Sequence, residues 1–154
     1  MRKRLAVIVL NYRTPRMTAD CLATLQSEID PQRDVVLVVA NASNDASAET
    51  LREEFARRGW QPWTRLLPSN VNRGFSGGNN LGIEAVSADF YLLLNSDTLV
   101  LPGALSRLLE AAERFPPAGL LGPRLEDPDG TPQTSCFRYH RPLSELISGR
   151  PPAR

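Results

Sequence analysis

Residues 90–98 read Phe90-Tyr91-Leu92-Leu93-Leu94-Asn95-Ser96-Asp97-Thr98, an apolar run followed directly by a short acidic turn. The continuous run predicts a buried strand over Phe90–Leu94, because strands covered on both faces lose the alternation of apolar and polar residues. Open α/β sheets bind ligands beyond the carboxyl ends of their strands, so Asp97 is expected at a ligand-binding edge. The alternative is that its carboxylate only caps the turn before Pro102.

The rest of the chain alternates apolar runs with segments of helical periodicity. Further strands are predicted at Leu5–Leu10, Val35–Val39, Trp63–Leu67 and Gly119–Leu121. Helices are predicted after Thr14-Pro15, from Asp45 as N-cap to Gly59, over Asn79–Val86, and from Leu101-Pro102-Gly103 onward. Such alternation favours a mostly parallel sheet with helices on both faces. The predicted fold class is therefore α/β, a three-layer α/β/α sandwich.

Length, charge and cysteine content argue against several classes of protein. The 154 residues suit one domain, and 18 basic against 17 acidic residues give no basic excess, so no nucleic-acid partner is expected. The apolar run Leu5–Leu10 is too short for a signal core or a membrane span. Cys21 and Cys136 form neither a metal motif nor a disulfide framework, which indicates reduced thiols in a cytoplasmic protein.

Two more polar turns follow predicted strands. Tyr12 comes directly after the first strand, where its ring can lie over a nucleotide base; the alternative is a half-buried packing residue. The stretch Ala40-Asn41-Ala42-Ser43-Asn44-Asp45 follows the second strand, and the amide of Asn41 can donate and accept hydrogen bonds. A helix-capping turn would explain the same stretch. Because parallel strands end at one edge of the sheet, Tyr12, Asn41 and Asp97 are expected to lie close together.

A stretch rich in glycine and asparagine lies within a loop expected over Pro68–Gly78 and at the start of the helix after it. It reads Asn70-Val71-Asn72-Arg73-Gly74-Phe75-Ser76-Gly77-Gly78-Asn79-Asn80. Its glycines allow the backbone to approach a ligand closely, and the N-terminus of the following helix would favour an anion. The spacing matches neither the GxGxxG fingerprint nor a P-loop. The alternative is a tight loop that only leads into the helix.

These four turns together resemble glycosyltransferase family 2 with the GT-A fold, the Rossmann-like fold of nucleotide-diphospho-sugar transferases, and especially its rhamnosyltransferase-like branch. The resemblance runs in order from about residue 5 to 136. It is carried by the stretches Val7–Tyr12, Val38–Asp45, Asn72–Asn80, Leu93–Thr98, Pro102–Leu105, Gly122–Arg124 and Asp129-Gly130. One such stretch would be unspecific, but the ordered set is specific for the family.

The resemblance implies a transferase of cell-wall or polysaccharide biosynthesis. Such an enzyme moves a sugar, with inversion, from a nucleotide diphosphate such as dTDP-rhamnose or a UDP-sugar to a hydroxyl of a glycan or lipid-linked acceptor. The implied cofactor is Mg²⁺ or Mn²⁺, with Asp97 as metal ligand at the family's DxD-like position. The implied donor-binding residues are Leu10, Asn11, Tyr12, Ala40, Asn41, Arg73, Gly74, Asn79, Asn95 and Ser96.

Two departures from the family pattern affect these expectations. The family usually has Asp where this chain has Ala40, and that Asp hydrogen-bonds the base edge; its loss would cost about 1.5–3 kcal/mol of donor binding. The second departure is the early end of the chain. The donor-binding domain, residues 1–136, is followed only by an Arg/Pro-rich tail, residues 137–154, expected to be the start of a missing acceptor half. Glu145 is the only acidic residue in that tail, so the catalytic base is not identified.

The leading expectation is a glycosyltransferase domain that is incomplete as a 154-residue chain. The protein would be cytoplasmic. Whether it associates peripherally with the inner face of the membrane is left open. The alternative is a non-catalytic nucleotide-sugar-binding or interaction module. Nucleotidyl transfer is less favoured, because Asn11-Tyr12-Arg13 lacks the glycine-rich loop that such enzymes carry after their first strand.

Overall fold

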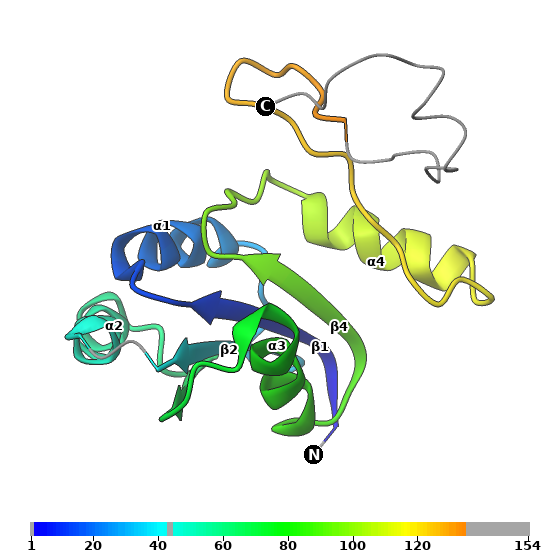
Figure 1. Ribbon diagram of the computed structural model, residues 1–154. Helices are drawn as coiled ribbons and strands as arrows, with labels where there is room; N and C mark the ends of the chain where they lie inside the picture. Colours follow the sequence, from blue (N-terminus) through cyan, green and yellow to red (C-terminus); the bar gives the residue numbers. More distant parts are fainter. Residues whose placement is uncertain (1, 43–44, 135–154) are drawn as a thin grey trace, which may run out of the picture. The chain divides into compact units, whose positions relative to one another are not determined.

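The computed structural model describes residues 2–42 and 45–134 (Figure 1). The chain divides into two compact units, Met1–Ala111 and Ala112–Arg154, which are described separately. The expected tail, Cys136 and Glu145 lie outside the described residues.

The first unit is built on a parallel sheet of four strands. They are β1 (Lys3–Asn11), β2 (Asp34–Asn41), β3 (Thr64–Ser69) and β4 (Ala88–Asn95), in the order β3-β2-β1-β4. Every neighbouring pair is parallel, and the labelled arrows β1, β2 and β4 in Figure 1 point toward the same end of the sheet. The four strands predicted in this region are confirmed. Three of them extend one or two residues beyond both predicted ends, whereas β3 begins one residue later than predicted and ends two residues later.

Helices cover both faces of this sheet. One apolar cluster joins alternate residues of β1 and β2 to α1 (Pro15–Leu25), α2 (Ser47–Arg58) and α4 (Ala104–Arg114). A second cluster on the opposite face joins the intervening residues, such as Ala6 and Ile8, to α3 (Gly74–Glu84). Side chains alternate across a strand, so the two clusters form the two sides of one sheet. The predicted three-layer α/β/α sandwich is confirmed.

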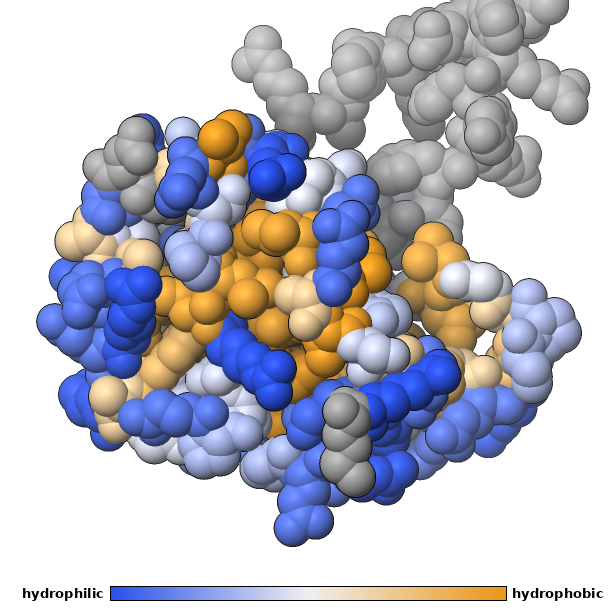
Figure 2. Space-filling model, turned by 90° about the horizontal axis from the view of Figure 1, so that it is seen from below, coloured by the Kyte–Doolittle hydropathy of each residue, from blue (hydrophilic) through white to orange (hydrophobic). Residues whose placement is uncertain are grey.

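Strand β2 lies inside the sheet and β4 at its edge, and their burial differs accordingly. Every residue of β2 is buried, whereas β4 alternates between half-buried and exposed positions. The prediction that Phe90–Leu94 is covered on both faces is therefore wrong, because β4 is an edge strand. Helix α3 packs on β1 and β2, and the side chains of Tyr91 and Leu93 on β4 stay 39% and 46% exposed. Figure 2 shows apolar side chains gathered in the middle of the face seen from below.

Helix α3 begins earlier than predicted. The loop was expected to reach Gly78 and the helix to start at Asn79, but the helix runs from Gly74 to Glu84. The glycines lie in the helix because it packs very closely on β1. A Cβ at Gly78 would lie 2.3 Å from Leu10 Cδ1, and one at Gly82 would lie 2.6 Å from Ile8 Cγ2. Two glycines four residues apart thus form the contact face of the helix, against their low helix propensity.

The ends of α1 and α2 follow local sequence signals. Pro15 occupies the first position of α1, where its missing N–H costs nothing. Gly59 ends α2 with φ +67° and donates its N–H to Ala56 and Phe55 carbonyls. The cap residue of α2 is Ala46 rather than the predicted Asp45, although Asp45 Oδ1 accepts the Ser47 N–H at 3.0 Å.

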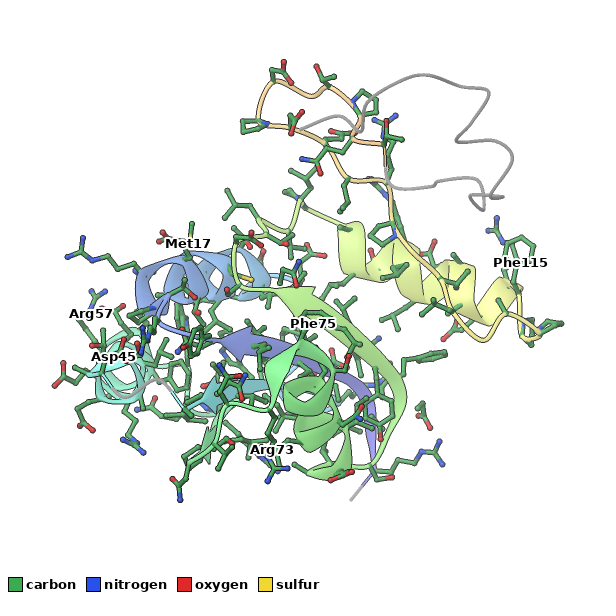
Figure 3. The ribbon with its side chains drawn as sticks, viewed as in Figure 1. Met17, Asp45, Arg57, Arg73, Phe75 and Phe115 are labelled. Atoms are coloured by element: carbon green, nitrogen blue, oxygen red, sulfur yellow. The ribbon has the colours of Figure 1, made fainter. Side chains whose placement is uncertain are left out.

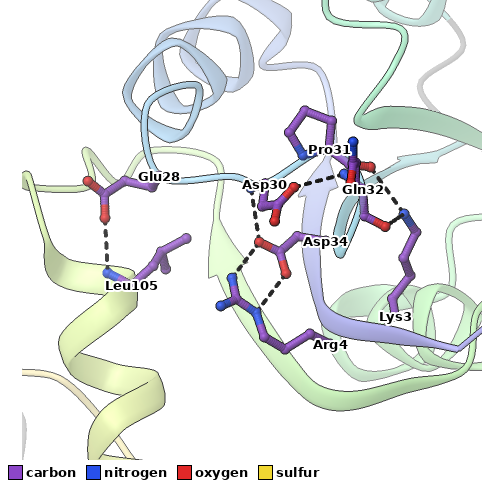
Figure 4. Close-up of polar contacts among 8 residues, drawn as sticks. All are labelled: Lys3, Arg4, Glu28, Asp30, Pro31, Gln32, Asp34 and Leu105. Carbon is purple, nitrogen blue, oxygen red and sulfur yellow. Dashed lines mark hydrogen bonds and ion pairs between the residues drawn. The ribbon is translucent and has the colours of Figure 1, made fainter.

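A buried ion pair fixes the edge of the sheet opposite the polar turns (Figure 4). The Arg4 guanidinium donates to both carboxylate oxygens of Asp34, at 3.0 and 2.7 Å, and Asp34 is fully buried. The Asp30 N–H donates to the same carboxylate at 3.0 Å. These bonds join the starts of β1 and β2 and the turn before β2.

The second unit contains little regular structure beyond the end of α4. The predicted strand Gly119–Leu121 is wrong: these residues form no strand, and Leu120 is 90% exposed. An isolated antiparallel bridge joins Glu126 to Pro132 around the predicted turn 127–130, where Gly130 donates to the Asp127 carbonyl at 2.8 Å. Among the described residues of both units, no helix is long and apolar enough to cross a membrane.

Candidate functional site

The polar turns meet because the strands end level with one another. In the sheet, Leu10 of β1 is paired with Asn95 of β4, and Asn11 is paired with Ala40 of β2. On the far side of β2, Asn41 is paired with Ser69 of β3. The expected positions after β1, β2 and β4 therefore form one continuous rim at the carboxyl edge of the sheet.

Direct contacts join the acidic turn after β4 to the segment after β1. The hydroxyls of Thr14 and Ser96 lie 3.3 Å apart, although the two residues are 82 positions apart in the chain. The Cys21 thiol donates to the Asn95 carbonyl at a Sγ–O distance of 3.8 Å. The turn that carries Asp97 thus lies against the start of α1, on the same edge of the sheet as Tyr12 and Asn41. The predicted convergence of these turns is confirmed.

Asn11 lies beneath this rim and is fully buried. Its Oδ1 accepts the Thr18 hydroxyl at 3.0 Å, and the Thr14 hydroxyl lies 3.5 Å from the same atom. Its Nδ2 has no hydrogen-bond partner among the described residues. Asn11 therefore keeps an unused donor at the carboxyl end of β1. Leaving a buried donor without a partner lowers the free energy of unfolding by about 1–3 kcal/mol. Thr14 and Thr18 were not among the predicted site residues, although their spacing of four at the start of a predicted helix was the available signal.

Tyr12 stands at the rim with its side chain accessible. The residue is 42% exposed, and the Arg13 guanidinium lies over its ring at 5.2 Å from the ring centre. Arg13 and Ala42, in the turns after β1 and β2, have φ angles of +61° and +52°. Non-glycine residues in this region are uncommon and are enriched at binding sites, where the surrounding structure must hold them.

Asp45 lies across from Arg13, at the start of α2, and is labelled in Figure 3. The Ser47 N–H donates to its carboxylate, and hydrogen bonding from Ser47 holds the pKa of Asp45 below the ordinary value, with a smaller contribution from the Arg13 charge. Asp45 thus closes the turn before α2, whereas the cap position itself is occupied by Ala46.

Asn41 anchors the glycine-rich segment to the sheet. Its Nδ2 donates to Asn72 Oδ1 at 3.0 Å and to the Gly74 carbonyl at 3.3 Å, and its Oδ1 accepts the Arg73 N–H at 2.9 Å. Asn72 Oδ1 also accepts the Gly74 N–H at 2.8 Å. All the hydrogen-bonding groups of the buried Asn41 side chain are in use, so it shapes the entry into α3. Asn72, absent from the predicted site residues, is part of this anchor.

Four other predicted donor-binding residues are placed in the interior or in helix α3. Leu10 is half-buried beneath Gly78, and Ala40 is only 5% exposed. Asn79 is buried and donates from Nδ2 to the Phe75 carbonyl at 3.0 Å, within α3. Gly74 has φ +65°, which explains why a glycine begins this helix. The Arg73 side chain is exposed at the start of the helix (Figure 3).

Asp97 is exposed at the rim, and no described residue donates a hydrogen bond to its carboxylate. Its negative charge acts on Cys21 in the middle of α1. Burial raises the pKa of the Cys21 thiol to about 12, and the Asp97 charge adds to this shift. Among the described residues, no cluster of three or more His, Cys, Asp or Glu side chains could hold a metal alone. Mg²⁺ commonly binds to one or two carboxylates together with waters and substrate phosphates, and Asp97 suits such a site.

The chain is similar to known proteins both in sequence and in structure. The sequence model described as glycosyl transferase family 2 matches residues 6–143. The N-acetylglucosaminyl-diphospho-decaprenol L-rhamnosyltransferase of Mycobacterium tuberculosis, in strains CDC 1551 and H37Rv, is 34% identical over 74% of this chain. The chain spans 38% of the length of these curated relatives.

Two solved structures are similar in fold. The mannosyltransferase PcManGT from Pyrobaculum calidifontis, in complex with GDP-Man and Mn²⁺, aligns with a TM-score of 0.65 and 20% identity, over 84% of this chain and 37% of that one. S. aureus TarS 1–349 aligns with a TM-score of 0.60 and 19% identity, over 73% of this chain and 33% of that one. At these identities the likeness shows the fold, which is of the GT-A type.

Proposed function

Because this chain belongs to glycosyltransferase family 2, we propose that its first unit binds a nucleotide-diphosphate sugar for transfer to an acceptor hydroxyl. The relatives support the class of reaction: one is a rhamnosyltransferase, and the solved neighbours include TarS in complex with UDP-GlcNAc. Since the chain spans 38% of the curated relatives, the activity and acceptor of the whole protein form part of the proposal.

One observation carries the proposal: the turns bearing Tyr12, Asn41 and Asp97 share one edge of the sheet. The pairing of Leu10 with Asn95 and the contact between the Thr14 and Ser96 hydroxyls support this arrangement. A nucleotide diphosphate needs an aromatic face, hydrogen-bonding groups and a cation or amides for its phosphates, and this rim supplies each kind of group.

The roles divide along the rim. The exposed ring of Tyr12 would lie against the base, and the amides at the start of α3, next to Arg73 and Gly74, would face the diphosphate. Asn95 and Ser96 would contact the ribose, and Asp97 would hold Mg²⁺ or Mn²⁺. A divalent cation there would neutralise charge on the leaving diphosphate. Asn41 would act by holding the α3 entry in place, because its own amide is occupied.

Ala40 sets an expectation for base affinity. It is paired with Asn11 in the sheet, and paired residues of neighbouring strands point to the same face about 4.8 Å apart. A carboxylate at position 40 would therefore have the unpartnered Asn11 Nδ2 within reach. The Asn11 amide would then hold this carboxylate in place. We expect Ala40→Asp to raise affinity for uridine diphosphate, because a charge-assisted hydrogen bond between the new carboxylate and the base edge contributes about 1.5–3 kcal/mol.

The experiment that tests the proposal is calorimetric titration with uridine, thymidine and guanosine diphosphates, each with and without Mn²⁺. At least one nucleotide should bind, and Mn²⁺ should strengthen the binding. Asp97→Asn should abolish the effect of Mn²⁺. Asp89→Asn is the matched control, because Asp89 lies at the opposite end of β4 and pairs there only with the exposed Arg2 among the described residues. No binding of any nucleotide to folded protein would rule out the proposal.

A non-catalytic nucleotide-sugar-binding module is the second candidate, favoured by Ala40, whose methyl group cannot hydrogen-bond a base. Transfer of a radiolabelled sugar to any acceptor by this chain would exclude it. For the catalytic candidate, we propose a glycan or lipid-linked acceptor and a cytoplasmic location at the inner face of the membrane. The curated relative supports this acceptor, because its name specifies a decaprenol-linked substrate.

A further inference from the structure

We propose that one face of α1 and the turn after it hold the acidic turn in its metal-binding position, through the side chains of Thr14, Cys21, Thr24 and Glu28. This set, the α1 polar row, contacts residues 95–105 at successive points. The inference rests on the proposed function, because it concerns how Asp97 is placed for a divalent cation. It assigns positioning roles to residues that contact neither substrate nor metal.

The spacing of the α1 polar row suits this role. Cys21 and Thr24 lie three residues apart in α1, so they point to the same side of the helix. Thr14 occupies the cap position at the start of α1 and Glu28 lies in the turn after it. At the start of the row, the Thr14 hydroxyl meets Ser96, the residue before Asp97. The next member, Cys21, meets the carbonyl of Asn95. Asp97 is thereby flanked on its N-terminal side by two contacts to α1.

Thr24 holds the other side of the acidic turn. Its hydroxyl donates to the Cys21 carbonyl at 2.7 Å and accepts the Val100 N–H at 3.0 Å. Residues 98–102 form no regular structure, so their amides depend on contacts such as this one. The Thr24 hydroxyl therefore fixes the backbone three residues after Asp97.

Glu28 completes the row at the start of α4 (Figure 4). Its two carboxylate oxygens accept the Gly103 N–H at 2.8 Å and the Leu105 N–H at 3.3 Å. The Gly103 amide directly precedes α4 and the Leu105 amide lies in its first turn, where a carboxylate is favoured by the helix dipole and satisfies free N–H groups. The segment 96–103 is thus tied at both ends and in its middle to a single rigid helix and the turn that follows it.

The consequence is a preorganised metal ligand. A carboxylate on an untethered loop must be ordered when the cation binds, whereas a tethered one is already in place. Residues that orient a ligand from outside the coordination shell typically change metal affinity by roughly 10–100-fold when they are removed. Loss of the Thr24 hydroxyl should therefore weaken Mn²⁺ binding while leaving metal-independent nucleotide binding nearly unchanged.

The test is Mn²⁺ affinity measured by electron paramagnetic resonance in the presence of uridine diphosphate, with metal-free nucleotide affinity from calorimetry. Thr24→Val should weaken Mn²⁺ binding about tenfold or more, and Thr24→Ser, which keeps the hydroxyl, should restore it. Thr50→Val is the matched control, because the Thr50 hydroxyl donates to the Ala46 carbonyl at the start of α2 and not to the acidic turn. This control should leave Mn²⁺ binding unchanged.

Glu28→Gln provides a second test that does not depend on the folding of Thr24→Val. It keeps one oxygen acceptor for the two amides and should weaken Mn²⁺ binding by a smaller factor. Unchanged Mn²⁺ affinity in both folded variants overturns the inference, and so does an equal loss of metal-dependent and metal-free nucleotide binding. Absence of nucleotide binding in the unmodified protein would instead overturn the proposed function, so the two failures are distinguishable.

Discussion

Replacement of Gly82 by Ala tests the close packing that places the glycines in α3. The added Cβ would lie 2.6, 3.1 and 3.2 Å from Ile8 Cγ2, Cγ1 and Cδ1, whereas ordinary contact starts at 3.4 Å. Ile8 is fully buried and β-branched, so it cannot rotate away at low cost. Overpacking of this kind costs about 1–3 kcal/mol, and the better helix propensity of Ala returns about 1 kcal/mol. We expect the free energy of unfolding to fall by about 1 kcal/mol, and by at most about 2.

Urea denaturation measures this change, with Gly78→Ala as the matched control in the same helix. A Cβ at Gly78 approaches Leu10 Cδ1 at 2.3 Å, but Leu10 is half-buried and the atom is the end of a flexible side chain. Gly78→Ala should therefore be less destabilising than Gly82→Ala, or stabilising. A Gly82→Ala variant as stable as the original protein or as Gly78→Ala would refute the argument from packing.

Three further predictions concern ionisable groups. In the Cys136→Ser variant, Cys21 should resist alkylation at pH 8 in the native state and react on unfolding, because burial raises its pKa to about 12; rapid native reaction would contradict this. Asp45 has a lowered pKa in the folded state, so its carboxylate contributes fully to stability above the ordinary pKa of 3.8, and this contribution is lost as the pH falls through the folded-state pKa. In Asp45→Asn, the melting temperature should therefore depend less on pH in that acidic range. An unchanged dependence of the melting temperature on pH would refute the prediction. Arg4→Met should lower the free energy of unfolding by about 3 kcal/mol in urea titrations, because it leaves the buried Asp34 carboxylate unpaired; a change below about 1 kcal/mol would show that water or other donors replace the guanidinium.

The strands and the shared edge could be predicted because they depend on local pattern and on one general rule. Continuous apolar runs such as Val35–Val39 are typical of parallel strands buried on both faces, and parallel strands present their carboxyl ends together. The positions of Tyr12, Asn41 and Asp97 along the rim followed from this rule. The strand predicted at Gly119–Leu121 failed because three apolar residues without a pairing partner do not form a strand.

The start of α3 and the use of Asn41 could not be predicted in the same way. Glycine favours loops by propensity, and only the approach of α3 to Ile8 and Leu10 explains why helix residues 78 and 82 lack side chains. Asn41 was expected to face the ligand, but its amide holds Asn72 and Gly74, which are 31 and 33 positions away. A single side chain offers the same hydrogen-bonding groups to a ligand or to a loop, and the sequence does not distinguish between them.

The amino-acid sequence by itself determined the α/β class, the strand positions and the family, because these follow from local periodicity and from an ordered set of short motifs. Tertiary structure decided the spatial order β3-β2-β1-β4, the helical state of the glycine-rich segment and the contacts of Thr24 and Glu28 with residues 100–105. These features depend on hydrogen bonds and packing between residues far apart in the chain, such as Thr24 and Val100 at a separation of 76. Local pattern carries no information about such pairs until the folded backbone brings them together.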